Sequence, residues 1–230
     1  MSEQSNMAAN PILAEFVRGN MVENKHRGAF CVVDEHGKVI ASAGEVDAMI
    51  YPRSAIKSLQ ALALFQSGAV EKFELTDQDL ALACASHKGE EFHVQGVSTF
   101  LAKIGMTAAD LECGAHAPFG KEARKLLRNS GQQPTALHNN CSGKHAGFLT
   151  LSQHLGGGAD YELLDHPVQQ AALEAFEVAT NETSPGHGID GCSAPNFACT
   201  LTGLARAMAG FAAATGGNAL SDAQVRLRQA

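Results

Sequence analysis

The spacing of hydrophobic residues changes from a strand pattern to a helix pattern along the chain. Residues 28–33 are apolar and favour β-structure, residues 34–37 form a turn that ends in glycine, and residues 38–42 are again typical of a strand. Two such runs joined by a short glycine-containing loop predict a β-hairpin. Beyond Pro52, apolar residues recur at the three- and four-residue intervals of a helix. We therefore expect strands near the start of the chain and helices over most of the remainder.

Residues that favour helix ends mark the expected helices. Pro52 can open the first helix, because the first helical turn does not need the N–H that proline lacks. Gly68 is expected to stop this helix near Gln66, and Thr76 is the expected N-cap of the next one. Further helices are expected at residues 92–104, 107–111, 121–128, 146–155, 167–180 and 197–214. Strands followed by many helices favour the α+β class, with helices packed on a small antiparallel sheet.

Composition and charge exclude several classes of partner. The chain has 230 residues and a formal net charge of −7, without a block of like charge. Phosphate would repel such a chain, so no nucleic-acid partner is expected. No apolar run approaches the roughly 20 residues needed to span a bilayer, and no secretory signal pattern is visible, which predicts a cytoplasmic protein without membrane contact. Six cysteines in that compartment are more typical of buried, catalytic or metal-binding thiols than of disulfides.

Candidate chemistry begins with a hydroxyl and an amine three residues apart. If Ser54 lies in the first helix, Lys57 shares its face. This pair is the minimum for a serine–lysine nucleophile, provided that the amine is neutral. Arg53 can supply nearby positive charge and the apolar flanks can supply desolvation, and both effects favour the neutral amine. Because Ser-x-x-Lys is a common pattern by chance, the neighbouring motifs decide between a catalytic pair and an ordinary helix start.

Three further polar segments each allow a functional and a structural interpretation. Ser86, His87 and Lys88 follow an apolar run, and they form either an ordinary helix C-terminus or a second hydroxyl site that converges on Ser54. The loop 188–195 presents an aspartate, a cysteine and a serine between glycines. It is either a solvated loop with one buried thiol or a site that binds a substrate amine and a metal.

The segment 139–147 has the highest density of polar groups. Cys141 is a candidate metal ligand with His145 one helical turn further on, or a thiolate at a helix N-terminus beside Lys144. A buried cysteine in a capped turn is the structural alternative. Cys192 can join Cys141 at a metal only if the fold assembles the site, because the two are far apart in the sequence.

These segments belong to a set of six motifs that occur together. The motifs are Glu23-Asn24-x-His26-Arg27, Arg53-Ser54-x-x-Lys57, Cys84-Ala85-Ser86-His87, Cys113-Gly114-x-His116, Asn140-Cys141-Ser142-Gly143-Lys144-His145 and Asp190-Gly191-Cys192. Their order and spacing closely resemble the L-asparaginase II family of the Rhizobium type, also called class 3 asparaginases. The resemblance extends from about Val17 to Ala214.

The resemblance implies hydrolysis of L-asparagine to L-aspartate and ammonia. It also implies a fold similar to serine β-lactamases and glutaminases, a homodimer, and a zinc ion. The implied catalytic residues are Ser54, Lys57 and Ser86; the implied substrate-binding residues are Arg53, His87, Asn140, His145 and Asp190; the implied zinc ligands are Cys141, Lys144 and Cys192. Lys144 thus replaces His145 as the expected ligand, and a metal can enforce the neutral amine that this requires.

The hypothesis that follows is an amidohydrolase with a covalent intermediate. Lys57 deprotonates Ser54, Ser54 attacks the side-chain amide, ammonia leaves, and water hydrolyses the β-aspartyl ester. Residues 1–16 are expected to be a variable tail and residues 17–230 the asparaginase domain. Family members continue further and carry the lysine partner of Ser86 there, so we expect that a C-terminal part is missing. The alternatives are another serine–lysine hydrolase, such as a glutaminase or a β-lactamase-like enzyme, and an inactive truncated remnant.

Overall fold

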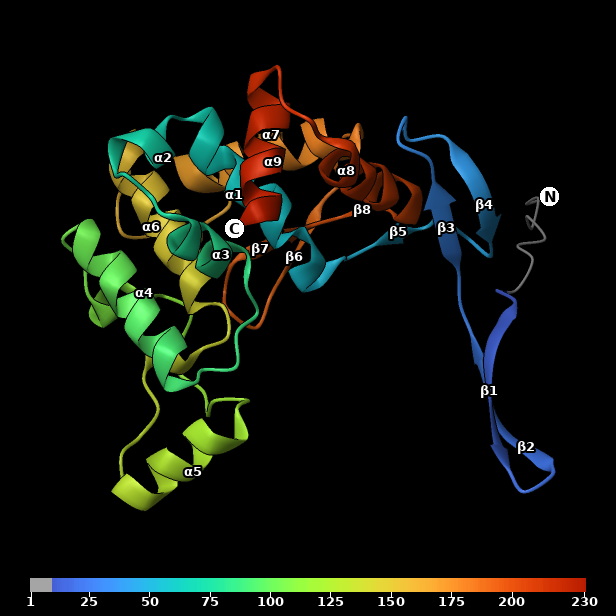
Figure 1. Cartoon of the computed structure of the whole chain (residues 1–230), viewed down its shortest axis with the longest axis horizontal. Coiled ribbons are helices and arrows are strands. Elements are labelled where there is room, and N and C mark those ends of the chain that lie inside the picture. Colours follow the sequence, from blue (N-terminus) through green and yellow to red (C-terminus); the bar gives the residue numbers. More distant parts are fainter. Residues whose placement is uncertain (1–9) are drawn as a thin grey trace, which may run out of the picture.

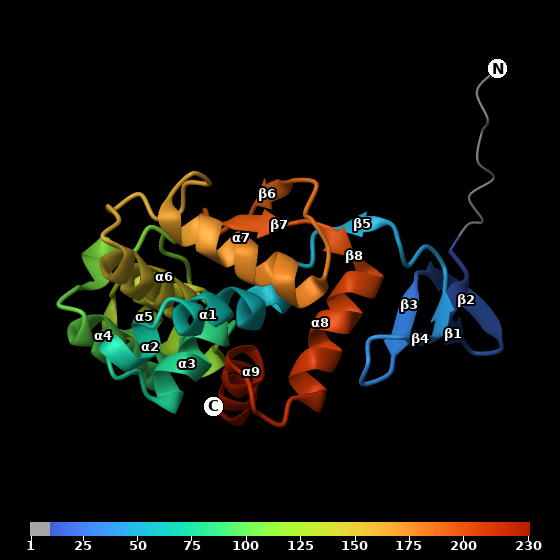
Figure 2. The same cartoon turned by 90° about the horizontal axis from the view of Figure 1, so that it is seen from above.

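The change from strands to helices near residue 52 divides the molecule into two visibly different parts (Figure 1). The structure, a computed structural model, describes residues 10–230. Residues 1–9, which make up the first part of the expected tail, lie outside the described residues. The strands of residues 12–43 occupy one end of the molecule in both views, whereas the shorter strands that follow lie beside or among the helices (Figures 1 and 2).

Two antiparallel hairpins form the N-terminal part. β1 (Ile12–Arg18) pairs with β2 (Met21–Arg27), and β3 (Phe30–Val33) pairs with β4 (Val39–Ala43). The second hairpin is the one that the sequence predicts. The first was not predicted, and it begins inside the segment that the sequence assigned to a variable tail. Every residue of β1 and β2 is exposed, so the two strands carry no alternation between buried and exposed positions that would have revealed them.

Two shorter strand pairs lie in the helical part, and the first of them ties its start to its end. β5 (Met49–Ile50) pairs with β8 (Cys199–Thr200), and β6 (His187–Ile189) pairs with β7 (Pro195–Phe197). The helix expected over residues 197–214 therefore begins later than predicted. Thr200 caps α8 by accepting a hydrogen bond from the N–H of Gly203, at 2.8 Å. The residues before it are strand because they pair with β5 and β6.

The helices follow the predicted order, except that the short ones at residues 69–72 and 136–138 were not predicted. They are η1 (Arg53–Ile56), α1 (Lys57–Gln66), α2 (Ala69–Lys72), α3 (Asp77–Cys84), α4 (Glu91–Lys103), η2 (Ala108–Asp110), α5 (Lys121–Ser130), η3 (Ala136–His138), α6 (Ser142–Leu155), α7 (Pro167–Thr180), α8 (Leu201–Ala213) and α9 (Ala219–Gln229). Thr76 caps α3 in a capping box with Asp79, as its position predicts. No helix in the part of the chain that the structure describes is long and apolar enough to cross a membrane.

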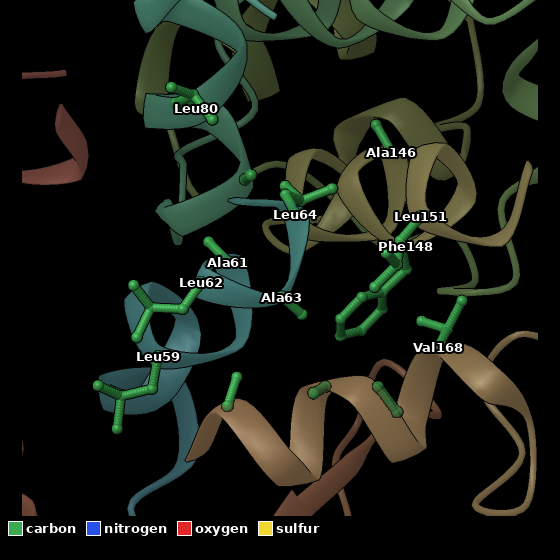
Figure 3. Close-up of a cluster of buried hydrophobic side chains, with 14 of the residues drawn as sticks. Leu59, Ala61, Leu62, Ala63, Leu64, Leu80, Ala146, Phe148, Leu151 and Val168 are labelled. Atoms are coloured by element: carbon green, nitrogen blue, oxygen red, sulfur yellow. The ribbon is translucent and has the colours of Figure 1, made fainter. Parts of the chain in front are cut away.

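The core forms around α1, which packs against α3, α6 and α7. Phe148 of α6 lies among the side chains of α1 and α7, close to Val168 (Figure 3). α6 is buried along most of its length, from Ser142 to Ser152. It approaches α3 so closely at Gly143 that any side chain there would collide with the carbonyl group of Leu82. This contact fixes the start of α6 against the end of α3, where two of the candidate motifs meet.

The α+β class is confirmed. The strands form four two-stranded antiparallel sheets within residues 10–230. α8 packs against β3 and thereby connects the N-terminal hairpins to the helices.

Candidate active site

Four segments that are distant in the sequence meet at one cavity, one of them the loop at residues 116–119. The β5–β8 pair places the η1 turn beside the β6–β7 hairpin, whose loop carries residues 190–194. The start of α6 closes the third side, and the enclosed space has a volume of about 210 Å³. The residues that line it are Arg53, Ser54, His116, Phe119, Asn139, Asn140, Cys141, Asp190, Gly191 and Cys192.

A carboxylate and a guanidinium group face each other in this cavity. Arg53 forms an ion pair with Asp190, whose side chain is 13% exposed, whereas the arginine side chain is 66% exposed. The backbone of Arg53 is left-handed, with φ of 53°, which is uncommon for a residue with a side chain. The helix predicted from Pro52 therefore starts as a distorted turn, and only Lys57 and the residues after it are α-helical.

Lys57 is buried and contacts a serine, but not the one that its spacing suggests. Its Nζ lies 2.6 Å from the carbonyl oxygen of Ala85 and 2.9 Å from Oγ of Ser86. Within residues 10–230, no hydrogen bond joins Lys57 to Ser54. Burial lowers the pKa of the Lys57 amine, and nearby Cys141 opposes that effect. A desolvated amine with two such neighbours can donate to the carbonyl group and accept the proton of the Ser86 hydroxyl.

The two expected catalytic serines occupy different positions. Both are exposed, but Ser54 lines the cavity, whereas Ser86 is not part of its described lining. Ser86 follows α3 directly, and the N–H of the next residue, His87, donates to the carbonyl group of Asn140 at 3.1 Å. The loop after α3 is thus fixed to the start of α6, with the Ser86 hydroxyl beside the Lys57 amine.

Two thiols and an amine form a buried cluster beside the cavity. Nζ of Lys144 donates to Sγ of Cys192 at 3.2 Å, and Cys141, Lys144 and Cys192 are each at most 7% exposed. A hydrogen bond from the thiol of Cys141 lowers the pKa of Cys192, and the same hydrogen bond raises the pKa of Cys141. Cys192 is therefore the more readily ionised thiol of the pair. Among residues 10–230, no three His, Cys, Asp or Glu side chains gather closely enough to hold a metal without a lysine.

His145 lies behind this cluster and not in the cavity. It is fully buried, and its Nδ1 lies 2.8 Å from the hydroxyl of Tyr161. That hydroxyl accepts the N–H of Glu112 at 2.8 Å, so its own proton points to His145. Burial lowers the pKa of His145, and nearby Cys192 opposes that effect. Its expected contact with substrate stays a prediction, and in the structure His145 lies next to Cys192 on the interior side of the cluster.

The sequence model of the L-asparaginase II family matches residues 14–230, nearly the whole chain. This chain belongs to the L-asparaginase II family. No curated protein matches it. Membership supports, in general terms, a hydrolase that acts on the amide of asparagine.

His87 has a structural place in this L-asparaginase II chain. It is buried, and the N–H of Gly89 donates to its Nδ1 at 3.1 Å. Its Nε2 therefore carries the proton and donates to Oγ of Ser142, at 2.8 Å. Burial and nearby His93 lower the pKa of His87 to about 4, so the ring is neutral. The ring joins the loop after α3 to the first residue of α6 and does not line the cavity, and its expected contact with substrate stays a prediction.

The family motifs account for most of the cavity, but not for all of it. Of the expected residues, Asn140 lies in the wall, where its N–H donates to Nε2 of His116 at 3.1 Å. His116 and Phe119 were not predicted as site residues, although the first belongs to one of the six motifs. Asn139 holds the turn before α6, because its Oδ1 accepts the N–H of Cys141 at 2.8 Å. Only the fold shows that these residues share a wall.

Proposed function

We propose that this chain hydrolyses the side-chain amide of L-asparagine to L-aspartate and ammonia, using a serine hydroxyl that is activated by Lys57. The observation that carries the proposal is the buried amine of Lys57, which lies 2.9 Å from a serine hydroxyl. Such an amine is suited to act as a general base, because desolvation favours its neutral form. Family membership supplies the amide substrate.

The ion pair in the cavity supports an amino-acid substrate. A free amino acid carries one ammonium and one carboxylate group, which match Asp190 and Arg53 respectively. We infer that the substrate separates the two side chains and takes the place of each partner. No net charge is then buried, since the charges that the substrate brings replace those that the side chains lose.

The volume of the cavity favours a small ligand. It is about 210 Å³, whereas pockets for drug-sized ligands usually have roughly 300–1,000 Å³. This difference favours asparagine over a β-lactam. Glutamine is one methylene longer, and we expect it to be the poorer substrate by about 10- to 200-fold in kcat/KM.

In the proposed reaction, Lys57 carries every proton that is transferred. Lys57 takes the proton from a serine Oγ, Oγ forms a bond to the amide carbon, and Lys57 gives the proton to the departing nitrogen. The C–N bond then breaks and ammonia leaves. Water attacks the resulting β-aspartyl ester while Lys57 again takes a proton, and the serine oxygen leaves with that proton.

Two serines are candidates for the nucleophile, and each has its own support. Ser54 lines the cavity and belongs to the first motif, so it remains our expected nucleophile. Ser86 has the hydrogen bond to Lys57 and is the alternative. A covalent ester on the peptide that contains Ser54 or Ser86 would distinguish them.

The cluster at Cys141, Lys144 and Cys192 has the chemistry to hold a zinc ion. Thiolates are preferred zinc ligands, the pKa of the Cys192 thiol is lowered, and the Lys144 amine lies 3.2 Å from its sulfur. When bound, zinc would supply the positive charge that keeps both thiols and the amine deprotonated. Because two of these residues lie at the start of α6 and the third lies in the loop that carries Asp190, their contacts hold the two segments together.

We also propose that the chain forms a homodimer in solution. Light scattering, which measures the molar mass of the particle, tests this proposal.

The decisive experiment is ammonia release from L-asparagine by the 230-residue chain in the presence of zinc. Release that is lost in Ser54→Ala supports Ser54 as the nucleophile, and release lost only in Ser86→Ala supports the alternative. Mass spectrometry of acid-quenched protein would locate an aspartyl ester. Absence of release from asparagine would contradict the proposal, and release from glutamine at equal kcat/KM would contradict its specificity.

A further inference from the structure

A buried amide at position 196 contacts both charged residues of the cavity. Asn196 lies in β7 and is 2% exposed. Its Oδ1 accepts the N–H of Arg53 at 3.1 Å, and its Nδ2 donates to the carbonyl group of Arg53, also at 3.1 Å. The same Nδ2 donates to Oδ2 of Asp190 at 3.3 Å. Both amide hydrogens are therefore used, one on each partner.

The backbone that Asn196 holds is one that needs support. Arg53 has φ of 53°, a conformation that disfavours any side chain with a Cβ. Asn196 pairs with both polar groups of this residue's backbone, as a neighbouring strand would. The opposite side of the cavity is also constrained, since Ser193 in the Asp190 loop has φ of 71° and donates its N–H to the carbonyl group of Asp190 at 2.9 Å.

We propose that Asn196 is the positioning residue that sets the distance and orientation between Arg53 and Asp190. The inference rests on the proposed function, in which these two side chains receive the carboxylate and the ammonium group of an amino acid. The side-chain amide of Asn196 holds Arg53 through its backbone and Asp190 through its carboxylate. Neither the backbone of Arg53 nor the carboxylate of Asp190 can then shift without breaking a hydrogen bond to a group that is nearly excluded from water, whereas the exposed guanidinium group can still turn toward a substrate.

The chemistry of position 196 is specific to asparagine. An aspartate has the same shape and keeps the acceptor for the N–H of Arg53, but it cannot donate and it places a second negative charge beside Asp190. Alanine removes all three hydrogen bonds. Thr180 provides a matched control, because it is a buried polar residue of α7 whose Oγ1 donates to the carbonyl group of Phe176 at 2.9 Å, outside the cavity.

The first test compares steady-state kinetics of Asn196→Asp, Asn196→Ala and Thr180→Val. We expect both variants at position 196 to raise KM for asparagine at least about tenfold, while kcat stays within about threefold of wild type, because the contacts concern substrate charge and not the reacting amide. Thr180→Val should lose thermal stability without a change in KM. An unchanged KM in both position 196 variants would overturn the inference.

A second test does not depend on turnover and separates this inference from the proposed function. Trypsin cleaves after arginine, and Arg53 is exposed but held by Asn196. We expect cleavage after Arg53 to be at least about tenfold faster in Asn196→Ala than in wild type, with Thr180→Val unchanged and cleavage after Arg18 in β1 as the internal reference. Equal cleavage rates after Arg53 would overturn the positioning role. If wild type releases no ammonia, the proposed function fails, and this comparison still decides the role of Asn196.

Discussion

The amine of Lys57 lies 2.9 Å from the hydroxyl of Ser86, a residue 29 positions further along the chain. The motif places Lys57 three residues after Ser54, and the sequence predicted a pair between those two. In the structure the Lys57 amine instead forms its hydrogen bond with Ser86. In the mechanism that we propose, this buried amine is the base for whichever of the two serines is the nucleophile.

Replacement of Lys57 by methionine tests this role. Methionine keeps the length of the side chain and removes the base, so we expect kcat to fall by about 10²–10⁴, the usual contribution of a general base. The free energy of unfolding should change little or rise, because a desolvated amine leaves the interior. Ammonia release and thermal unfolding measure the two effects.

Lys72→Met serves as the control for that replacement, because Lys72 is an exposed lysine in α2. Full activity in Lys57→Met would contradict the proposed base, whatever its effect on stability.

Removal of the Arg53 side chain should affect binding more than stability. The side chain is two-thirds exposed, so its ion pair with Asp190 contributes only about 0–1 kcal/mol to stability. We expect Arg53→Ala to raise KM for asparagine and to leave the thermal midpoint nearly unchanged. Arg18→Ala, which removes an exposed ion pair with Glu23 in the N-terminal hairpin, should change neither. A KM equal to that of wild type in Arg53→Ala would refute the carboxylate contact.

Stability should depend on pH through His87. Its pKa is about 4 in the folded chain and 6.5 ordinarily, so the unfolded chain binds the extra proton between these values. The contribution of His87 to the free energy of unfolding is therefore fully present above about pH 6.5 and is lost as pH falls toward 4. For one proton, the free energy of unfolding changes by at most about 1.4 kcal/mol per pH unit. Urea unfolding between pH 4 and 7 measures the slope.

His87→Gln provides the comparison, since glutamine does not titrate. We expect the variant to be less stable at pH 7 and to show a shallower pH dependence over the same interval. An identical slope in wild type and variant would assign the titration to another group.

Zinc content should depend on Cys192 and not on a cysteine of similar burial. Cys192→Ser removes the only thiol of the cluster whose pKa is lowered, so we expect the purified variant to lose bound zinc. Cys199 is 1% exposed, and burial raises its pKa to about 11, which makes Cys199→Ser the matched control. Equal zinc content in the two variants, measured by elemental analysis, would exclude the proposed ligand set.

The hydroxyl of Tyr161 should contribute to stability through two partners. Tyr161→Phe leaves the N–H of Glu112 and Nδ1 of His145 without their hydrogen bond, and we expect a loss of about 1–3 kcal/mol. Tyr51→Phe is the control, because Tyr51 is more than half exposed. Chemical denaturation of the two variants should separate them, and equal midpoints would show that water replaces the lost contacts.

Local signals in the sequence predicted much of the fold. α7 runs from Pro167 to Thr180 as expected, because proline favours the first helical position and Asn181 adopts the left-handed conformation that ends a helix. α8 starts at Leu201 and not at Phe197, because a short apolar run does not distinguish a buried strand from a buried helix.

The site was predictable where residues carry a motif and not where the fold alone creates a contact. Arg53, Ser54 and Asp190 do line one cavity, as the motifs suggested. The partner of Lys57 depends on how the end of α3 approaches α6, and no spacing in the sequence encodes that approach. Asn196 belongs to no motif and becomes visible only once β7 lies beside the η1 turn.

The contact between Arg53 and Asn196 spans 143 positions of the chain. During synthesis, the ribosome therefore releases the Lys57 segment long before the strand that organises it. Helices such as α1 and α3 can form early from local interactions, whereas the pairing of β5 with β8 must wait for the distant residues to emerge. We therefore expect the nascent chain to pass through a stage in which the candidate nucleophiles exist without the proposed binding site, so that any reaction waits until the fold is nearly complete.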